Sequence, residues 1–125
     1  IYPRFRLVYA GDAAAGGFPV GSVTAGKAGE RMRLALWQGI SPAGDIDRAL
    51  REAETALAAA AAMGAAALVL PEVWLPGYNQ PDIGACALAL DSPPLHRLAQ
   101  LARTARTALV VGYAERDGES VYNAA

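Results

Sequence analysis

Beyond its first quarter, the sequence alternates apolar runs of strand length with helical patterns, and this alternation constrains the fold more than any other feature. Residues 33–38 (RLALWQ) have the length and apolar content of a buried strand. Turn residues follow at 41–45, and apolar side chains then recur at helical spacing over 46–63. Asp45 stands where an N-cap is needed and Gly64 where a helix stops. We therefore predict a strand followed by an amphipathic helix.

The second part of the sequence repeats this alternation. Residues 66–70 form another apolar run, Ser92 with two prolines opens a second helix, and residues 107–114 (TALVVGYA) form a third strand. The turn residues 116–119 lead into a fourth strand, 121–125, which is expected to pair with the third as a hairpin. This order favours an α/β fold with a largely parallel sheet covered by helices, in which functional residues gather at the carboxyl ends of the strands.

The first thirty-one residues have a different character. They hold six of the thirteen glycines, and Phe5–Ala10 is their only strand-like run. A proline and two arginines stand where a secretory leader would need an apolar centre. We predict that residues 1–31 are a disordered or non-native arm and that residues 32–125 form the folded portion. Met32 is our hypothesis for the natural start, because the codons for the preceding Gly29-Glu30 can form a ribosome-binding sequence.

Composition limits the partners of the chain. Its 125 residues carry a net charge of −1, with 54% hydrophobic and 18% charged residues, which suits one soluble domain with a real core. This charge gives no drive toward nucleic acid or an acidic membrane surface, and the apolar runs stop short of the ~20 residues of a membrane span. The single cysteine, Cys86, fits a reducing compartment, so a cytoplasmic location is expected. One cysteine and one histidine, His96, do not make a metal site, and no cofactor is expected.

An acid lies directly after the second apolar run, in the stretch ALVLPEVWLPGY over residues 67–78. Glu72 is therefore predicted at the carboxyl end of a buried strand. Its apolar neighbours Leu70, Val73 and Trp74, with the leucine after them, are expected to desolvate the carboxylate in part, which suits a general acid or base. The alternative is an exposed loop glutamate that follows a strand only because Pro71 ended it.

Four segments occur in a recognisable order. They are MRLALWQ at 32–38, AAMGAAALVLPE at 61–72, PE-x(4)-GY at 71–78, and GYAER from 112 with YN at 122–123. Together they resemble the amino-terminal part of the nitrilase superfamily, the carbon–nitrogen hydrolases. The resemblance covers about three quarters of the chain.

The resemblance implies an α/β fold of the four-layer α-β-β-α sandwich type, of which this chain would be the truncated N-terminal part. It also implies hydrolysis of an amide, carbamoyl or nitrile carbon–nitrogen bond by a Glu-Lys-Cys set. Glu72 matches the general base of that set. The family's lysine and cysteine follow the YN strand and have no counterpart before Ala125, so the chain alone is expected to be inactive. Self-association, as a homo-oligomer, is implied by the resemblance alone.

Several further residues invite a role. Tyr78 and Asn79 follow the motif closely enough to line a substrate pocket beside Glu72, although Tyr78 could instead pack as a lid on the sheet. Cys86 lies among small apolar residues and is expected to pack rather than react. Glu115 and Asn123 are expected to tie the hairpin to neighbouring backbone.

Two classes of function follow. The first is an enzyme acting on a small-molecule carbon–nitrogen substrate, and the segment PEVWLPGYN favours the amidase or carbamoylase branches over true nitrilases. The second is a non-catalytic α/β module for binding or interaction. A downstream lysine segment and a strand-end cysteine would decide for the enzyme.

Overall fold

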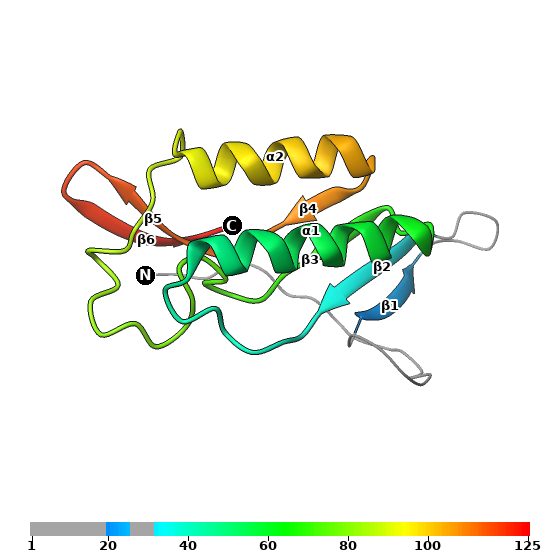
Figure 1. Cartoon of the computed structure of the whole chain (residues 1–125), viewed down its shortest axis with the longest axis horizontal. Coiled ribbons are helices and arrows are strands. Elements are labelled where there is room, and N and C mark those ends of the chain that lie inside the picture. The colour runs from blue at the N-terminus through cyan, green and yellow to red at the C-terminus, as the bar shows by residue number, and fades with distance from the viewer. Residues whose placement is uncertain (1–19, 26–31) are drawn as a thin grey trace.

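A computed structural model describes residues 20–25 and 32–125 of the chain. These residues form six strands and two helices (Figure 1). In chain order the elements are β1 (Val20–Ala25), β2 (Met32–Trp37), α1 (Ile46–Ala62), β3 (Ala67–Val69), α2 (Pro93–Ala105), β4 (Ala108–Val110), β5 (Tyr113–Asp117) and β6 (Ser120–Ala124).

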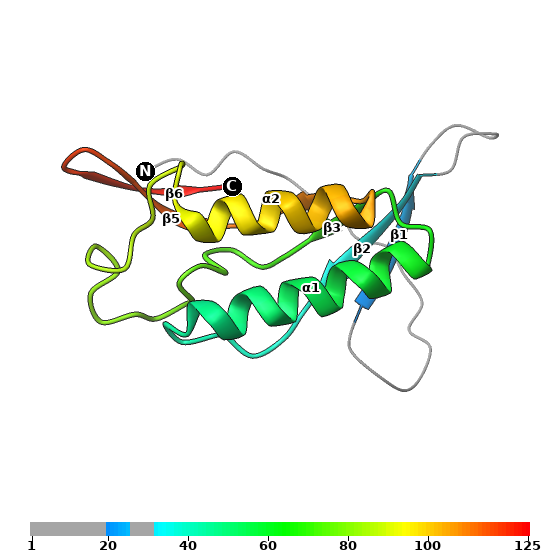
Figure 2. The same cartoon turned by 45° about the horizontal axis from the view of Figure 1, so that its top comes forward.

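The main sheet has the strand order β1-β2-β3-β4. Strands β2, β3 and β4 are parallel, and β1 joins the edge of the sheet antiparallel to β2. Both helices lie side by side on one face of this sheet, as Figures 1 and 2 show from two directions. Strands β5 and β6 form a separate hairpin, which extends at the end of the molecule opposite to β1. The α/β class is confirmed, while the four-layer sandwich stays a prediction.

Helix α1 ends one residue before its predicted end, and α2 begins at the predicted prolines, because these boundary signals are local. The Asp45 carboxylate accepts a hydrogen bond of 2.8 Å from the Arg48 amide and so caps α1. Gly64 follows α1 with a φ of 66°, a left-handed conformation that glycine adopts without steric cost. Helix α2 begins at its prolines, with Ser92 as an extended N-cap, and ends at Arg106 in the left-handed region.

The core lies between the helices and the sheet. Alternate residues of the strands face the helices, so Ala35 and Leu68 are fully buried on adjacent strands. Helix α1 contributes mostly small side chains, which let it lie close to the sheet and to α2. Its buried residues are Ala49, Ala53, Ala56, Leu57 and Ala60.

The opposite face of the sheet is less covered. Leu36, Val69 and Val110 lie in register across β2, β3 and β4, and none of them is fully buried. Val110 is 44% exposed, whereas the residue before it, Leu109, is half-buried. The described residues therefore supply helices for one face of the sheet only.

Two expectations need correction. The predicted third strand, 107–114, is broken: β4 ends at Val110, and Tyr113 begins β5 in the second sheet. The predicted hairpin does form, but its first strand is β5. Within the predicted arm, residues 20–25 form β1, which the sequence did not lead us to expect. The rest of the arm, including Phe5–Ala10, lies outside the described residues.

Candidate active site

Glu72 lies in the loop that follows β3, at the carboxyl edge of the parallel strands. The connections that leave β2, β3 and β4 all meet at this edge (Figure 1). In parallel sheets this edge is where loops can bring side chains from several strands together. The predicted position of Glu72 is thus the observed one.

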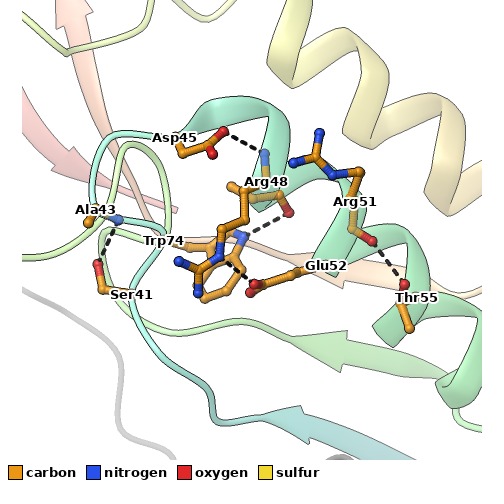
Figure 3. Close-up of polar contacts among 9 residues, drawn as sticks. Ser41, Ala43, Asp45, Arg48, Arg51, Glu52, Thr55 and Trp74 are labelled. Atoms are coloured by element: carbon orange, nitrogen blue, oxygen red, sulfur yellow. Dashed lines mark hydrogen bonds and ion pairs between the residues drawn. The ribbon is translucent and has the colours of Figure 1, made fainter.

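The Glu72 loop is anchored by a buried quartet, Trp74–Gly77. Trp74 is only 2% exposed and is the largest fully buried side chain in the described chain. Its indole Nε1 donates to the carbonyl oxygen of Ala49 in α1 at 3.4 Å (Figure 3). A large side chain held at both its ring and its polar atom fixes the loop against the start of α1.

A second anchor joins this loop to the one after β2. The Tyr78 amide donates to Ser41 Oγ at 2.9 Å, and the Gly44 amide donates to the Pro76 carbonyl oxygen at 2.8 Å. The two loops approach so closely that a Cβ atom on Gly77 would lie 2.7 Å from the backbone nitrogen of Ala43. Since Gly77 also has a φ of 118°, a side chain at this position is excluded on two grounds.

The break between β4 and β5 has its physical cause at the same site. A Cβ atom on Gly112 would lie 2.6 Å from the Val73 nitrogen and 2.8 Å from Glu72 Cα, so only glycine allows this approach. The Gly112 carbonyl oxygen accepts from the Leu75 amide at 3.2 Å. The Ala114 amide in turn donates to the Leu75 carbonyl oxygen at 2.8 Å. Because residues 112–114 pair with the Glu72 loop, the chain leaves the first sheet after β4.

Backbone strain accompanies these contacts. Val73, next to Glu72, has a φ of 46°. A β-branched residue in the left-handed region is a true outlier, with a cost of roughly 1–3 kcal/mol. Such conformations persist where the surroundings fix them, and they gather at functional sites.

The Glu72 side chain is exposed, which corrects the expectation that its apolar neighbours desolvate it. Leu70, Trp74 and Leu75 point into the core instead, so the loop separates its apolar side chains from its acid. Asn123 of β6 donates from Nδ2 to Glu72 Oε1 at 2.5 Å. The prediction that Asn123 bonds to neighbouring backbone is wrong in this respect, because its side-chain amide bonds to a side chain.

A cavity of about 410 Å³ opens beside Glu72, within the range of small-molecule sites. Tyr78 and Asn79, the two predicted pocket residues, both line it. Tyr78 is 59% exposed and so does not pack as a lid on the sheet. The lining is mostly apolar and comes from the Glu72 loop and the hairpin. It comprises Glu72, Val73, Tyr78, Asn79, Gln80, Ile83, Ala114, Val121, Tyr122 and Asn123.

Glu72 and Tyr78 also border a second cavity, of about 240 Å³. Its other walls come from the loop after β2, including Ser41 and Pro42, and from the buried Trp74. Glu72 thus stands between two cavities, one formed with the hairpin and one with the loop after β2.

Neither Cys86 nor Tyr113 lines a cavity beside Glu72. Cys86 is half-buried. Burial raises the pKa of Tyr113 above its ordinary value of 10.0, and the Glu115 carboxylate adds to the rise. The Tyr113 hydroxyl therefore keeps its proton near neutral pH. Within residues 20–25 and 32–125, no group of three or more His, Cys, Asp and Glu side chains could hold a metal ion.

Neither of the helices that the structure describes is long and apolar enough to cross a bilayer.

Sequence reasoning did not identify all residues at this site. Asn123, Ser41 and Gly112 contact the Glu72 loop from other parts of the chain, and only the fold brings them there. The one available signal was the YN pair at 122–123, a polar residue at a strand end beside an aromatic one.

Comparison with known proteins gives one family. The model of the carbon-nitrogen hydrolase family matches residues 33–125. The match spans both helices, the parallel strands, the Glu72 loop and the hairpin.

Individual relatives agree with this match. A protein named as a hydrolase in the pqqF 5′ region of Pseudomonas protegens is 42% identical over 97 residues, which are 74% of this chain and 33% of that protein. A nitrilase of Pseudomonas syringae is 31% identical over 107 residues, covering 74% of this chain and 32% of its own. An aliphatic nitrilase of Rhodococcus rhodochrous is 33% identical over 93 residues, covering 62% of this chain and 25% of that protein. The chain thus spans at most about a third of the length of these relatives.

Proposed function

Because the chain belongs to the carbon-nitrogen hydrolase family, we propose that the full-length protein hydrolyses a non-peptide carbon–nitrogen bond of a small nitrile, amide or carbamoyl compound, with Glu72 as general base. The observation that carries the proposal is the presentation of Glu72. A single exposed carboxylate stands between two cavities, on a loop that is anchored on several sides. A general base needs this combination of access and fixed position.

In the proposed reaction, Glu72 takes the proton from a cysteine thiol, and the thiolate attacks the substrate carbon. A lysine, with backbone amides, stabilises the negative charge that develops on the substrate. Glu72 passes this proton to the substrate nitrogen, which departs as ammonia or an amine (from a nitrile, after water has added to the thioimidate). The regenerated carboxylate then takes a proton from the water that hydrolyses the acyl-enzyme and frees the thiol. Cys86 does not line the cavities beside Glu72, and the one lysine, Lys27, precedes the Glu72 motif, whereas the lysine of the family follows the YN strand. We therefore assign the thiol and the lysine to residues outside this sequence, and residues 1–125 alone should not turn over substrate.

The cavity lined by Tyr78 and Asn79 supports a role for both in substrate binding. The Tyr78 hydroxyl can donate to a nitrile nitrogen or an amide oxygen, and the Asn79 amide can both donate and accept. The mostly apolar lining suits the carbon skeleton of a small substrate.

Two observations bear on the substrate. Several relatives are named as nitrilases, which favours nitriles. The motif PEVWLPGYN favours amides or carbamoyl compounds. The substrate panel should therefore hold matched nitrile, amide and carbamoyl members with the same carbon skeletons.

The experiment measures ammonia release by the full-length protein and its Glu72→Gln variant. Glutamine keeps the size and the hydrogen bond from Asn123 but cannot accept the proton. We expect turnover to fall by roughly 10²–10⁴-fold, the usual contribution of a positioned base. The free energy of unfolding should change by less than about 0.5 kcal/mol, because Glu72 is exposed.

Glu119→Gln is the matched control, since Glu119 is also exposed and lies in the turn between β5 and β6, outside both cavities. Its turnover should equal that of the wild type. Normal turnover by Glu72→Gln would show that Glu72 is not a catalytic residue. A full-length protein that hydrolyses no member of the panel would favour the non-catalytic binding module.

A further inference from the structure

We propose that Asn123 is the positioning residue of Glu72, a role that rests on the proposed function of that carboxylate. Asn123 Nδ2 donates to Glu72 Oε1 at 2.5 Å. A carboxylate on a flexible side chain samples several rotamers, and a bond to one oxygen selects among them. With Oε1 held by Asn123, the second oxygen, Oε2, is the one that receives the proton.

The backbone holds both partners of this bond in place. Asn123 pairs with Ala114 across the β5–β6 hairpin. The Ala114 amide donates to Leu75 in the Glu72 loop at 2.8 Å. A hydrogen-bonded ladder therefore runs from the loop through β5 to β6, and the side-chain bond closes it. The donor is thus placed in advance of substrate binding, as preorganised catalysis requires.

Stability does not explain this bond. Both side chains are exposed, so water could satisfy either of them if the bond were absent. Exchange with water leaves such bonds with a small net contribution to folding. A role in orientation fits the exposure of both groups better.

The choice of amide is also informative. An arginine or lysine at position 123 would stabilise the ionised carboxylate more strongly and so make Glu72 a weaker base. An aspartate would repel Glu72. The neutral amide of asparagine orients the carboxylate while adding no charge beside it.

The test uses the full-length protein and the substrate that the wild type hydrolyses fastest. In Asn123→Ala, kcat should fall by roughly 10- to 100-fold, the scale of a misplaced reacting group. Asn123 also lines the cavity proposed for the substrate, but its amide is engaged with Glu72, so the loss should fall mainly on kcat and KM should rise less than kcat falls. The melting temperature should not change. A residue that only supported the fold would lower the melting temperature together with the activity.

Two variants at the same position sharpen the test. Asn123→Gln keeps the amide and should recover part of the lost kcat, whereas the like charge in Asn123→Asp should lower kcat further. Gln100→Ala, an exposed amide on α2 away from the site, is the matched control and should behave as the wild type.

A double-mutant cycle with Glu72→Gln measures the coupling directly. If Asn123 acts through Glu72, adding Asn123→Ala to Glu72→Gln should cause almost no further loss. Additive losses, a kcat in Asn123→Ala equal to wild type, or a raised KM at unchanged kcat would each overturn the assignment while leaving Glu72 as the base. A wild type without turnover on the whole panel would reject the proposed function and this assignment with it.

Discussion

The core beneath the helices and the loop that carries Glu72 are held by different kinds of contact. The core consists of many apolar side chains, and most of those that α1 contributes are alanines, each of which buries little surface. The loop depends on a few buried side chains that join this core, of which Trp74 is the largest, and on hydrogen bonds to Ser41 and to the backbone at Gly112. Stability is therefore distributed in the core and concentrated in the loop.

Within a few residues of this loop, the side chains that stabilise the fold are therefore distinct from those that can take part in the reaction. Trp74–Gly77 are buried, whereas Glu72, Tyr78 and Asn79 on either side are exposed. The buried residues fix the path of the loop, and the exposed ones line the cavities. Substitutions in the first group should change the free energy of unfolding, and substitutions in the second should change activity alone.

The largest loss in the free energy of unfolding is expected for Trp74→Ala, which removes the largest buried side chain of the loop. Loss of a buried indole typically costs roughly 3–5 kcal/mol, and the Ala49 carbonyl oxygen also loses its donor at 3.4 Å. Urea unfolding of the full-length protein measures the change. Trp74→Phe, which keeps a ring but no N–H group, is the control and should lose much less. A loss below about 1 kcal/mol for the alanine variant would mean that the loop is held as diffusely as the core.

Gly112→Ala tests the close approach between the strand break and the loop. A Cβ atom would meet the Val73 nitrogen at 2.6 Å, so the backbone must move, at a cost of roughly 1–3 kcal/mol. Because the same atom would lie 2.8 Å from Glu72 Cα, turnover should fall together with stability. At Gly84, the control, the nearest atom is a side-chain oxygen of Asp82 at 3.3 Å, and Gly84→Ala should be tolerated. Wild-type stability in Gly112→Ala would contradict the close approach.

Local signals made much of the fold predictable. The ends of α1 follow from Asp45 and Gly64, which act on neighbouring backbone, and the position of Glu72 follows from the strand before it. The break at Gly112 could not be predicted, because TALVVGYA is a good strand sequence. Its cause is the contact with the Glu72 loop, which is distant from Gly112 in the sequence.

The candidate site was only partly predictable for the same reason. Sequence placed Glu72, Tyr78 and Asn79 together, since they share one loop. It suggested a desolvated carboxylate because apolar residues surround Glu72 in the chain, yet a loop can turn adjacent side chains in opposite directions. The contact with Asn123 depends on how the hairpin packs against the loop, which no local pattern encodes.

The smallest effect is expected for Ser41→Ala, which removes a single polar anchor of the loop. Ser41 Oγ accepts from the amides of Tyr78 at 2.9 Å and Ala43 at 3.3 Å. The side chain is only half-buried, so water can replace it in part, and the loss should be near 0.5–1.5 kcal/mol. Tyr78 stands at the substrate end of the loop, so KM should rise more than kcat falls. The control is Ser120→Ala, at an exposed position that starts β6. A fall in kcat as large as that of Glu72→Gln, at unchanged KM, would contradict this expectation. It would mean that Ser41 helps to position the base Glu72, and that substrate binding and catalysis are not divided between the two ends of the loop.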